Sequence, residues 1–258
     1  MKNIFQKKII IILYISFTAP LFSESVYTLD LKTELIIGTF TASMFAANFF
    51  IDSDPKDIKS KDNINFLDRQ FMYPYNKTIN TVSTVGAATA LVLPVFSVFE
   101  NKRDLKFLGT YSVMYAEAFL LTMATKDFFK QVVSRNRPYT YEGHIPAGKE
   151  NEYYHSFPSG HTAYAFLGAT FLAATFSKEY TDSSWKLPLV ISSYSLAATV
   201  GALRIASGSH FATDVLAGAF IGSFYGWFIP YLHFKPGNNE SEIVVIPAGN
   251  SLFFSVSF

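Results

Sequence analysis

Apolar stretches of helix length alternate with polar, turn-rich connectors along most of the chain. Six such stretches follow residue 30, at residues 35–51, 79–99, 107–127, 161–177, 187–203 and 213–233. They are rich in Ala, Gly, Ser and Thr, and small residues let helices pack closely in lipid. Several runs are about 17–20 residues long, near the lower limit for crossing a bilayer. The pattern predicts an all-α, six-helix bundle embedded in a membrane, and a soluble bundle of buried helices is the alternative.

The two ends of the chain differ from this bundle. Residues 1–25 combine a basic start, an apolar run and small residues at a plausible cleavage position. This predicts a signal peptide, with an uncleaved N-terminal anchor as the alternative. Residues 26–234 then hold the helical domain. In residues 235–258, two apolar runs flank Ala248-Gly249-Asn250, which predicts a short C-terminal β-hairpin tail.

Charge is scarce in this chain. Only 16% of the 258 residues are charged, against about 25% in a soluble domain. Charged residues inside the apolar segments include Glu117, Lys126 and Asp214, and a charge at that depth is costly unless it is paired or functional. The net charge of +1 gives no support for nucleic-acid binding. The absence of cysteine excludes disulfides, thiolate metal sites and cysteine nucleophiles.

A first polar stretch follows the third apolar segment and carries Lys130 and Arg137. The planar guanidinium of Arg137 can bind two phosphate oxygens, and Lys130 can act as a point charge. The alternative is a basic cluster that anchors the end of a membrane helix. Arg135, between the two, is expected to contact the surface or lipid head groups.

A second stretch, Pro158-Ser159-Gly160-His161, opens the fourth segment. The backbone N–H groups of Gly160 and His161 can point at an anion, helped by the helix dipole. The Ser159 hydroxyl can donate to the same anion, and His161 can protonate a leaving oxygen. The alternative is an ordinary helix start with Ser159 as its N-cap.

A third stretch bridges the fifth and sixth segments with Arg204, His210 and Asp214. His210 and Asp214 are spaced i and i+4, so on a helix they would share a face. A carboxylate that holds one imidazole nitrogen leaves the other free to attack, while Arg204 adds a third cation. The alternative is a helix-capping His/Asp pair. Together, the three stretches suit in-line phosphoryl transfer through a histidine nucleophile.

These stretches resemble the type 2 phosphatidic acid phosphatase (PAP2), or lipid phosphate phosphatase, superfamily, which is related to bacterial acid phosphatases and vanadium haloperoxidases. Its pattern is K-x6-R-P, then P-S-G-H, then S-R-x5-H-x3-D. The match covers residues 130–214, and the six-helix layout extends it to about 35–233, inside a PAP2-type phosphatase domain at 26–234. Leu203 stands where the family usually has serine, which would weaken phosphate binding without removing a catalytic role.

The resemblance implies a role for each matched residue. His210 would be the nucleophile, Asp214 would orient it, and His161 would be the general acid. The phosphate would be held by Lys130, Arg137, Arg204, Ser159 and Gly160. A phosphohistidine intermediate would then be hydrolysed by water. No cofactor and no metal are implied, because the cations would neutralise the equatorial oxygens.

The remaining polar residues have simpler interpretations. His144 and His233 are expected to be ordinary loop and helix-end residues, whereas His155 could line the entrance of the site. The acidic residues near position 55 are expected to form a solvated loop; they are Asp52, Asp54 and Asp57.

A site embedded in a membrane favours a phosphate or pyrophosphate carried by a lipid. The candidates are undecaprenyl pyrophosphate, phosphatidic acid, phosphatidylglycerol phosphate and lipid A. The alternatives are a periplasmic acid phosphatase that acts on soluble phosphomonoesters, a vanadium haloperoxidase, and a non-catalytic membrane scaffold or transporter. No protein partner is indicated by the sequence.

The orientation in the membrane depends on two conflicting signals. All three motifs lie on one side of a six-span bundle. A cleaved signal peptide would place that side in the cytoplasm, whereas Lys102, Arg103 and Lys106 indicate that the opposite side is cytoplasmic. Following the family, we expect a bacterial-type cell envelope and a site that faces the periplasm.

Overall fold

The computed structural model describes residues 25–51, 61, 64–98, 105–143, 145–235, 243–248 and 251–256. Within these residues the chain forms seven α-helices, two 3₁₀ segments and one pair of strands. The elements are α1 (Leu31–Phe50), α2 (Phe66–Gln70), α3 (Lys77–Val92), η2 (Leu93–Val98), α4 (Leu105–Val133), η3 (Pro138–Glu142), α5 (Gly160–Glu179), α6 (Lys186–Ala206), α7 (Ala212–His233), β1 (Ile243–Ala248) and β2 (Ser251–Val256).

Several predicted features lie outside the described residues. They are the signal peptide apart from its last residue, the acidic loop with Asp52, Asp54 and Asp57, the loop cations Lys102 and Arg103, and His144.

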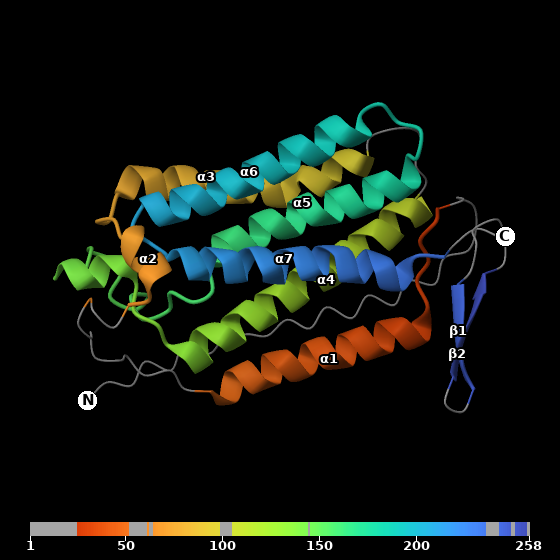
Figure 1. Cartoon of the computed structure of the whole chain (residues 1–258), viewed down its shortest axis with the longest axis horizontal. Coiled ribbons are helices and arrows are strands. Elements are labelled where there is room, and N and C mark those ends of the chain that lie inside the picture. Colours follow the sequence, from red (N-terminus) through yellow and green to blue (C-terminus); the bar gives the residue numbers. More distant parts are fainter. Residues whose placement is uncertain are drawn as a thin grey trace.

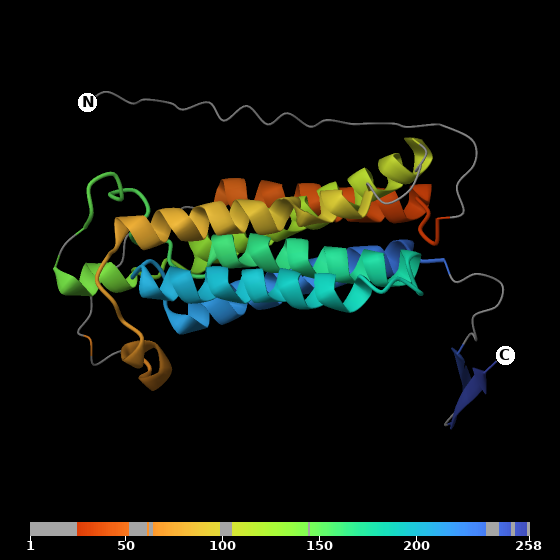
Figure 2. The same ribbon diagram turned by 90° about the horizontal axis from the view of Figure 1, so that it is seen from above.

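The long helices form one elongated bundle with α5 inside it (Figures 1 and 2). α5 packs against α3, α4, α6 and α7, whereas α1 packs along α4 at the edge of the bundle. Each of the six predicted apolar segments corresponds to one long helix, although the segment 79–99 continues beyond α3 into η2. The described residues also contain α2, a five-residue helix that the sequence did not predict because it lies in a polar connector.

Small residues allow the closest approach, which is between α5 and α7. A side chain at Gly218 would collide with the backbone oxygen of Ser159, and one at Gly222 would collide with that of Ala163. The backbone N–H of Ser159 also donates to the backbone oxygen of Asp214, at 2.9 Å. The start of α5 is therefore held directly against the first turn of α7.

The core has two parts of different character. An alanine-rich part lies between α3, α5 and α6 and comprises Ala87, Ala90, Ala165, Ala169, Ala197 and Val200. A second part is built of larger side chains, including Phe107, Tyr111, Met114, Leu121, Leu167, Phe171 and Ile229. The small residues thus serve close helix packing, as the sequence predicts, and the aromatic residues fill the wider space beside α4.

In the described part of the chain, four helical segments are long and apolar enough to cross a membrane, whereas the sequence pattern predicts six. They are Lys77–Val95, Leu105–Glu142, Lys186–Ala206 and Ala212–His233. α1 and α5 are not among them. α5 is surrounded by other helices, and its sequence is rich in Ala, Gly and Thr. Large apolar side chains such as Phe220 and Leu187 are exposed on the outer helices. These are the features of a membrane protein.

The C-terminal strands pair with each other. β1 runs antiparallel to β2, and Ala248 lies opposite Ser251 next to the turn.

Candidate active site

The three predicted motif stretches meet at one end of the bundle. This is the end where α4 and α6 finish and where α5 and α7 begin (Figure 1). The turn from α6 to α7 carries His210, and it depends on Gly208, which has a φ of +67° and lies against the backbone of Tyr73 and Pro74. The chain therefore brings Lys130, Arg137, the start of α5 and Arg204 to the same place.

His210 is buried and held in one tautomer. Its Nδ1 atom lies 2.7 Å from the backbone oxygen of Ser156. A carbonyl oxygen only accepts, so Nδ1 carries the proton and Nε2 is left with its lone pair. Nε2 lies 3.1 Å from Nη1 of Arg137. Burial and the Arg137 guanidinium hold the pKa of His210 well below its usual value. The imidazole is thus neutral, with its nucleophilic nitrogen beside a cation.

Asp214 acts on His210 less directly than the i, i+4 spacing predicts. α7 begins at Ala212, so His210 precedes the helix and the two residues do not share a helical face. Oδ2 of Asp214 lies 3.6 Å from Nδ1 of His210. The same oxygen accepts from the hydroxyl of Ser156 at 2.5 Å and from the backbone N–H of Phe211 at 2.9 Å. Asp214 therefore fixes the segments on both sides of the imidazole.

Arg135 is not a surface residue, so that prediction is wrong. Its guanidinium bridges two fully buried carboxylates, with Nη1 at 2.6 Å from Oδ1 of Asp214 and Nη2 at 2.7 Å from Oδ2 of Asp68. It also lies over the ring of Phe211, 4.0 Å from the centroid. The reason is topological, because the connector that carries α2 folds back over the start of α7.

Asp68 is a part of the site that the sequence did not reveal. Its carboxylate accepts from the backbone N–H of Thr213 at 2.9 Å and from the Thr213 hydroxyl at 2.7 Å. Burial opposes ionisation of Asp68, but the hydrogen bonds from Arg135 and Thr213 hold its pKa below its usual value. No pattern in the polar connector distinguishes this carboxylate from its neighbours.

The Asp68→Asn variant tests this bridge. It is expected to lower the free energy of unfolding by about 2 kcal/mol, because Arg135 loses a charge-assisted hydrogen bond. It should also slow turnover, since Arg135 holds Asp214. The melting temperature and kcat of the detergent-solubilised protein measure the two effects. Glu142→Gln breaks the exposed pair with Lys61 and is the matched control, with an expected change of less than about 1 kcal/mol. Equal melting temperatures for the two variants would contradict the assignment.

Three cations converge on the site without a carboxylate partner. Lys130 donates from Nζ to the backbone oxygen of His155 at 2.7 Å. Arg137 donates to the backbone oxygens of Glu152, at 2.9 Å, and Ser209, at 3.0 Å. Within the described residues, no carboxylate forms an ion pair with Lys130, Arg137 or Arg204. Buried cations held only by neutral groups are costly, and a bound anion would offset that cost.

Arg204 is held by residues of α3. Its Nη1 atom donates to Oδ1 of Asn80 at 2.7 Å and to the hydroxyl of Ser83 at 3.1 Å. Its Nε atom is buried and has no hydrogen-bond partner. Asn80, Ser83 and Thr84 are spaced i, i+3 and i+4 on α3, so they share one face of the helix, and the sequence does contain this signal. The hydroxyl of Ser83 also gives Arg204 a polar neighbour although Leu203 replaces the family serine.

The start of α5 is open toward the site. Ser159 does not cap the helix with its side chain, and its hydroxyl lies 2.9 Å from that of Thr162. A side chain at Gly160 would lie only 3.2 Å from Cδ of Lys126, so glycine keeps the backbone accessible. The first N–H groups of the helix remain available to an anion.

His161 lies in the first turn of α5, with Nε2 at 3.2 Å from the hydroxyl of Thr84. Burial and the positive charges of Arg204, Arg137 and Lys130 lower the pKa of His161 to about 3. A bound phosphate dianion would oppose those charges and raise this pKa again. The imidazole can therefore take up a proton when a phosphate is bound and release it to a leaving oxygen.

Comparison with known proteins shows which protein family this region of the chain matches. Residues 111–237 match the model of the PAP2 superfamily. Lipid phosphate phosphatase 1 of Arabidopsis thaliana is 32% identical over 194 residues, which are 66% of this chain and 59% of that protein. Residues 111–237 belong to the PAP2 superfamily. Lys130, Arg137, the start of α5, Arg204, His210 and Asp214 all lie inside the matched PAP2 region, whereas Asp68 and the α3 residues lie before it.

The alignments with two further relatives cover smaller parts of both proteins. Probable lipid phosphate phosphatase 4 of Arabidopsis thaliana is 36% identical over 140 residues, which are 45% of each chain. Lipid A 1-phosphatase of Porphyromonas gingivalis is 41% identical over 112 residues, which are 37% of this chain and 24% of that protein. The chain spans about half the length of the first two curated relatives.

Proposed function

We propose that the chain is a metal-independent phosphatase that hydrolyses a phosphate or pyrophosphate carried by a lipid, through a phosphohistidine at His210. The observation that carries this proposal is the charge arrangement. Three cations without carboxylate partners among the described residues, the buried Arg137 and Arg204 and the partly buried Lys130, surround a neutral imidazole whose Nε2 atom is unprotonated. Such a site suits a phosphoryl group, because the cations can neutralise its equatorial oxygens while Nε2 approaches phosphorus in line with the leaving oxygen.

In the first step, the lone pair of Nε2 forms a bond to phosphorus as the bond to the leaving oxygen breaks. His161 gives its proton to that oxygen. The positive charge that develops on the His210 imidazole is stabilised by the Ser156 carbonyl and by Asp214, 3.6 Å from Nδ1. In the second step, neutral His161 takes a proton from water, whose oxygen attacks phosphorus, and His210 leaves as the neutral imidazole.

An apolar groove beside the site supports a lipid substrate. It has a volume of about 410 Å³ and lies between α4 and α7, with Phe129, Phe157, Ala217 and Phe220 among its walls. Phe157 directly precedes the Pro158-Ser159 motif, and Ala217 follows Asp214 by three residues. An acyl or prenyl chain in this groove would place its phosphate at the start of α5. The names of the relatives also refer to lipid phosphate and lipid A.

The Ala217→Trp variant tests the groove. Filling it should raise KM for lipid phosphates by at least about 10-fold, since two methylenes excluded from an apolar contact already cost about 1.6 kcal/mol. Turnover of p-nitrophenyl phosphate, which has no lipid chain, should stay close to that of the unmodified protein. Leu216→Trp, on the exposed outer side of α7, is the control. Equal KM values for lipid in the two variants would contradict this position of the chain.

We also propose that the site faces the periplasm of a bacterial-type cell envelope. Lys106, at the start of α4, lies at the end of the bundle opposite to the site, and its predicted loop carries two more cations (Figure 1). Cationic loops favour the cytoplasmic side, so the opposite end would be periplasmic. Labelling of single cysteines placed at Lys106 and at Lys149 in intact cells, with a reagent that does not cross membranes, tests this. Labelling at Lys149 alone is the expected result.

The substrate is tested by phosphate release from a matched panel in detergent. The panel holds undecaprenyl pyrophosphate, phosphatidic acid, phosphatidylglycerol phosphate, lipid A and p-nitrophenyl phosphate. Preference for one of the lipids is expected. Equal or better activity on the soluble ester would favour a periplasmic acid phosphatase instead. No release from any of the five would favour the haloperoxidase or scaffold alternatives.

A further inference from the structure

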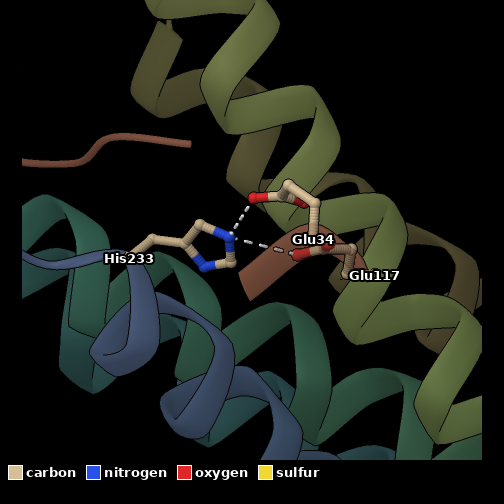
Figure 3. A group of neighbouring side chains, drawn as sticks. All are labelled: Glu34, Glu117 and His233. Carbon is tan, nitrogen blue, oxygen red and sulfur yellow. Dashed lines mark hydrogen bonds and ion pairs between the residues drawn. The ribbon is translucent and has the colours of Figure 1, made fainter. Parts of the chain in front are cut away.

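A second group of ionisable side chains lies inside the bundle, away from the phosphate site. Glu34 comes from the first turn of α1, Glu117 from the middle of α4, and His233 from the last turn of α7 (Figure 3). His233 is buried rather than an ordinary helix-end residue, with only 1% of its side chain exposed. The last turn of α7 and the first turn of α1 lie at the end of the bundle opposite to His210 (Figure 1).

The chain before α1 brings these helix ends together. The backbone N–H of Thr28 donates to the backbone oxygen of His233 at 3.0 Å, and that of Lys235 donates to the oxygen of Val26 at 2.8 Å. Asp30 then caps α1 through the backbone N–H of Thr33. This short pairing fixes the first turn of α1 beside the last turn of α7, while α4 packs against both helices.

The three side chains present their ligand atoms to one another. Nε2 of His233 lies 2.9 Å from Oε1 of Glu34 and 3.5 Å from Oε2 of Glu117, and all the ligand atoms lie within 4.8 Å of one another. Donor atoms bound at about 2.0–2.2 Å in tetrahedral geometry are separated by about 3.3 Å, which falls between the two observed distances. A small movement of Glu34 away from the imidazole would complete such a triangle.

The second nitrogen of His233 is already satisfied. Nδ1 lies 2.9 Å from the backbone oxygen of Ile229, and a carbonyl can only accept. The ring is thus oriented so that Nε2 faces the carboxylates. A backbone carbonyl on the far nitrogen is the usual support of an imidazole that binds a metal, since it fixes both the tautomer and the ring orientation.

The charge of the group calls for a cation. A metal would bind the deprotonated groups, in which the two carboxylates carry two negative charges beside a neutral imidazole. Within the described residues, neither Glu34 nor Glu117 forms an ion pair with a lysine or an arginine. Oε2 of Glu117 is buried and has no hydrogen-bond partner. Buried carboxylates are stable only when paired or bound to a metal.

We propose that Glu34, Glu117 and His233 bind one divalent cation of the Zn²⁺ class that ties α1 to α4 and α7. One imidazole with two carboxylates suits Zn²⁺ and similar first-row ions, whereas Ca²⁺ and Mg²⁺ prefer oxygen ligands alone. Such an ion cancels both negative charges. The Glu34 side chain is 24% exposed, which leaves a route for the ion and for a water molecule as a fourth ligand. The role is structural and separate from the phosphatase chemistry.

Metal binding is tested on the full chain, purified in detergent without a histidine tag. The protein is treated with a chelator, reloaded with Zn²⁺ and dialysed, and its zinc content and melting temperature are measured. About one zinc ion per chain is expected, with a melting temperature several degrees above that of the chelated protein. Zinc-free protein with an unchanged melting temperature would overturn the proposal. It would indicate that the three side chains share a proton instead of binding a metal ion.

Three variants locate the ion. Glu117→Gln keeps the shape of the side chain and should lose both the zinc and the stabilisation. If Glu117→Gln does not fold, Glu34→Gln, at a partly exposed position, is measured in its place and should also lose both. Glu142→Gln removes an exposed carboxylate elsewhere and should keep both. Unchanged zinc content in Glu117→Gln or Glu34→Gln would overturn the site. With Co²⁺ in place of Zn²⁺, the visible absorption of a tetrahedral complex should appear in the unmodified chain and be absent from both Gln variants.

Discussion

The His210→Ala variant is expected to lose at least about 10³-fold in kcat on every phosphate ester, because it removes the group assigned to form the covalent intermediate. Nε2 of His210 is the one imidazole nitrogen of that ring without a proton, and Arg137 lies 3.1 Å from it. The loss should be similar for lipid and soluble esters, since both would react through the same nitrogen. Phosphate release under saturating substrate measures it.

Binding of inorganic phosphate is the control for this variant. Lys130, Arg137 and Arg204 remain in place, so the variant should still bind phosphate and should melt close to the unmodified protein. Loss of turnover together with retained binding would identify a chemical role. A kcat within about 10-fold of the unmodified protein would contradict the assignment of the nucleophile.

The His161→Ala variant is expected to show a loss that depends on the leaving group. On lipid phosphates, whose leaving oxygen needs a proton, kcat should fall by about 10²–10⁴-fold. On p-nitrophenyl phosphate, the phenolate leaves without a proton, so the first step should be almost unaffected. The cations that lower the pKa of His161 to about 3 in the free site are the ones that bind the phosphate, which links its protonation to substrate binding.

The quantity to measure is the ratio of the two losses in the rate of the first step, followed as release of the leaving group in a single turnover. Overall turnover is not suitable, because the second step also uses His161 and is slowed equally for both esters. A much larger loss on the lipid than on p-nitrophenyl phosphate supports proton donation by His161. The same loss on both esters would contradict it and would assign His161 to phosphate binding alone. Thr84→Val removes the hydroxyl that lies 3.2 Å from Nε2 and is a milder companion variant, with the same direction of effect expected.

The sequence predicts the helices and the convergence of the motifs well, because both depend on local patterns. Each apolar run of helix length corresponds to one long helix, with the run 79–99 extending past α3 into η2. The glycines of α7 meet the backbone of α5 as small residues do in tight bundles. The motifs fall at helix ends in the sequence and at one end of the bundle in the structure. Four of the six predicted spans are found among the described helices by length and composition, and α5 lies in the centre of the bundle.

The long-range contacts are what the sequence does not reveal. Arg135 pairs with Asp68, which is 67 residues away, and Glu34 meets His233, which is 199 residues away. Neither pair has a spacing that a local pattern could detect. The His210 and Asp214 spacing was detected but misread, since it assumed a helix that starts only after His210. Polar partners set by tertiary packing thus require the structure.

The central claim is that His210 carries the phosphoryl group, and the covalent intermediate tests it most directly. The His161→Ala variant should form the phosphoenzyme from p-nitrophenyl phosphate without a proton donor, but it should hydrolyse it slowly because no base activates water. Quenching under alkaline conditions followed by peptide mass spectrometry should then find phosphate on His210, in the base-stable, acid-labile form of phosphohistidine. Phosphate on another residue, or label that persists when His210 is also changed to alanine, would contradict the mechanism.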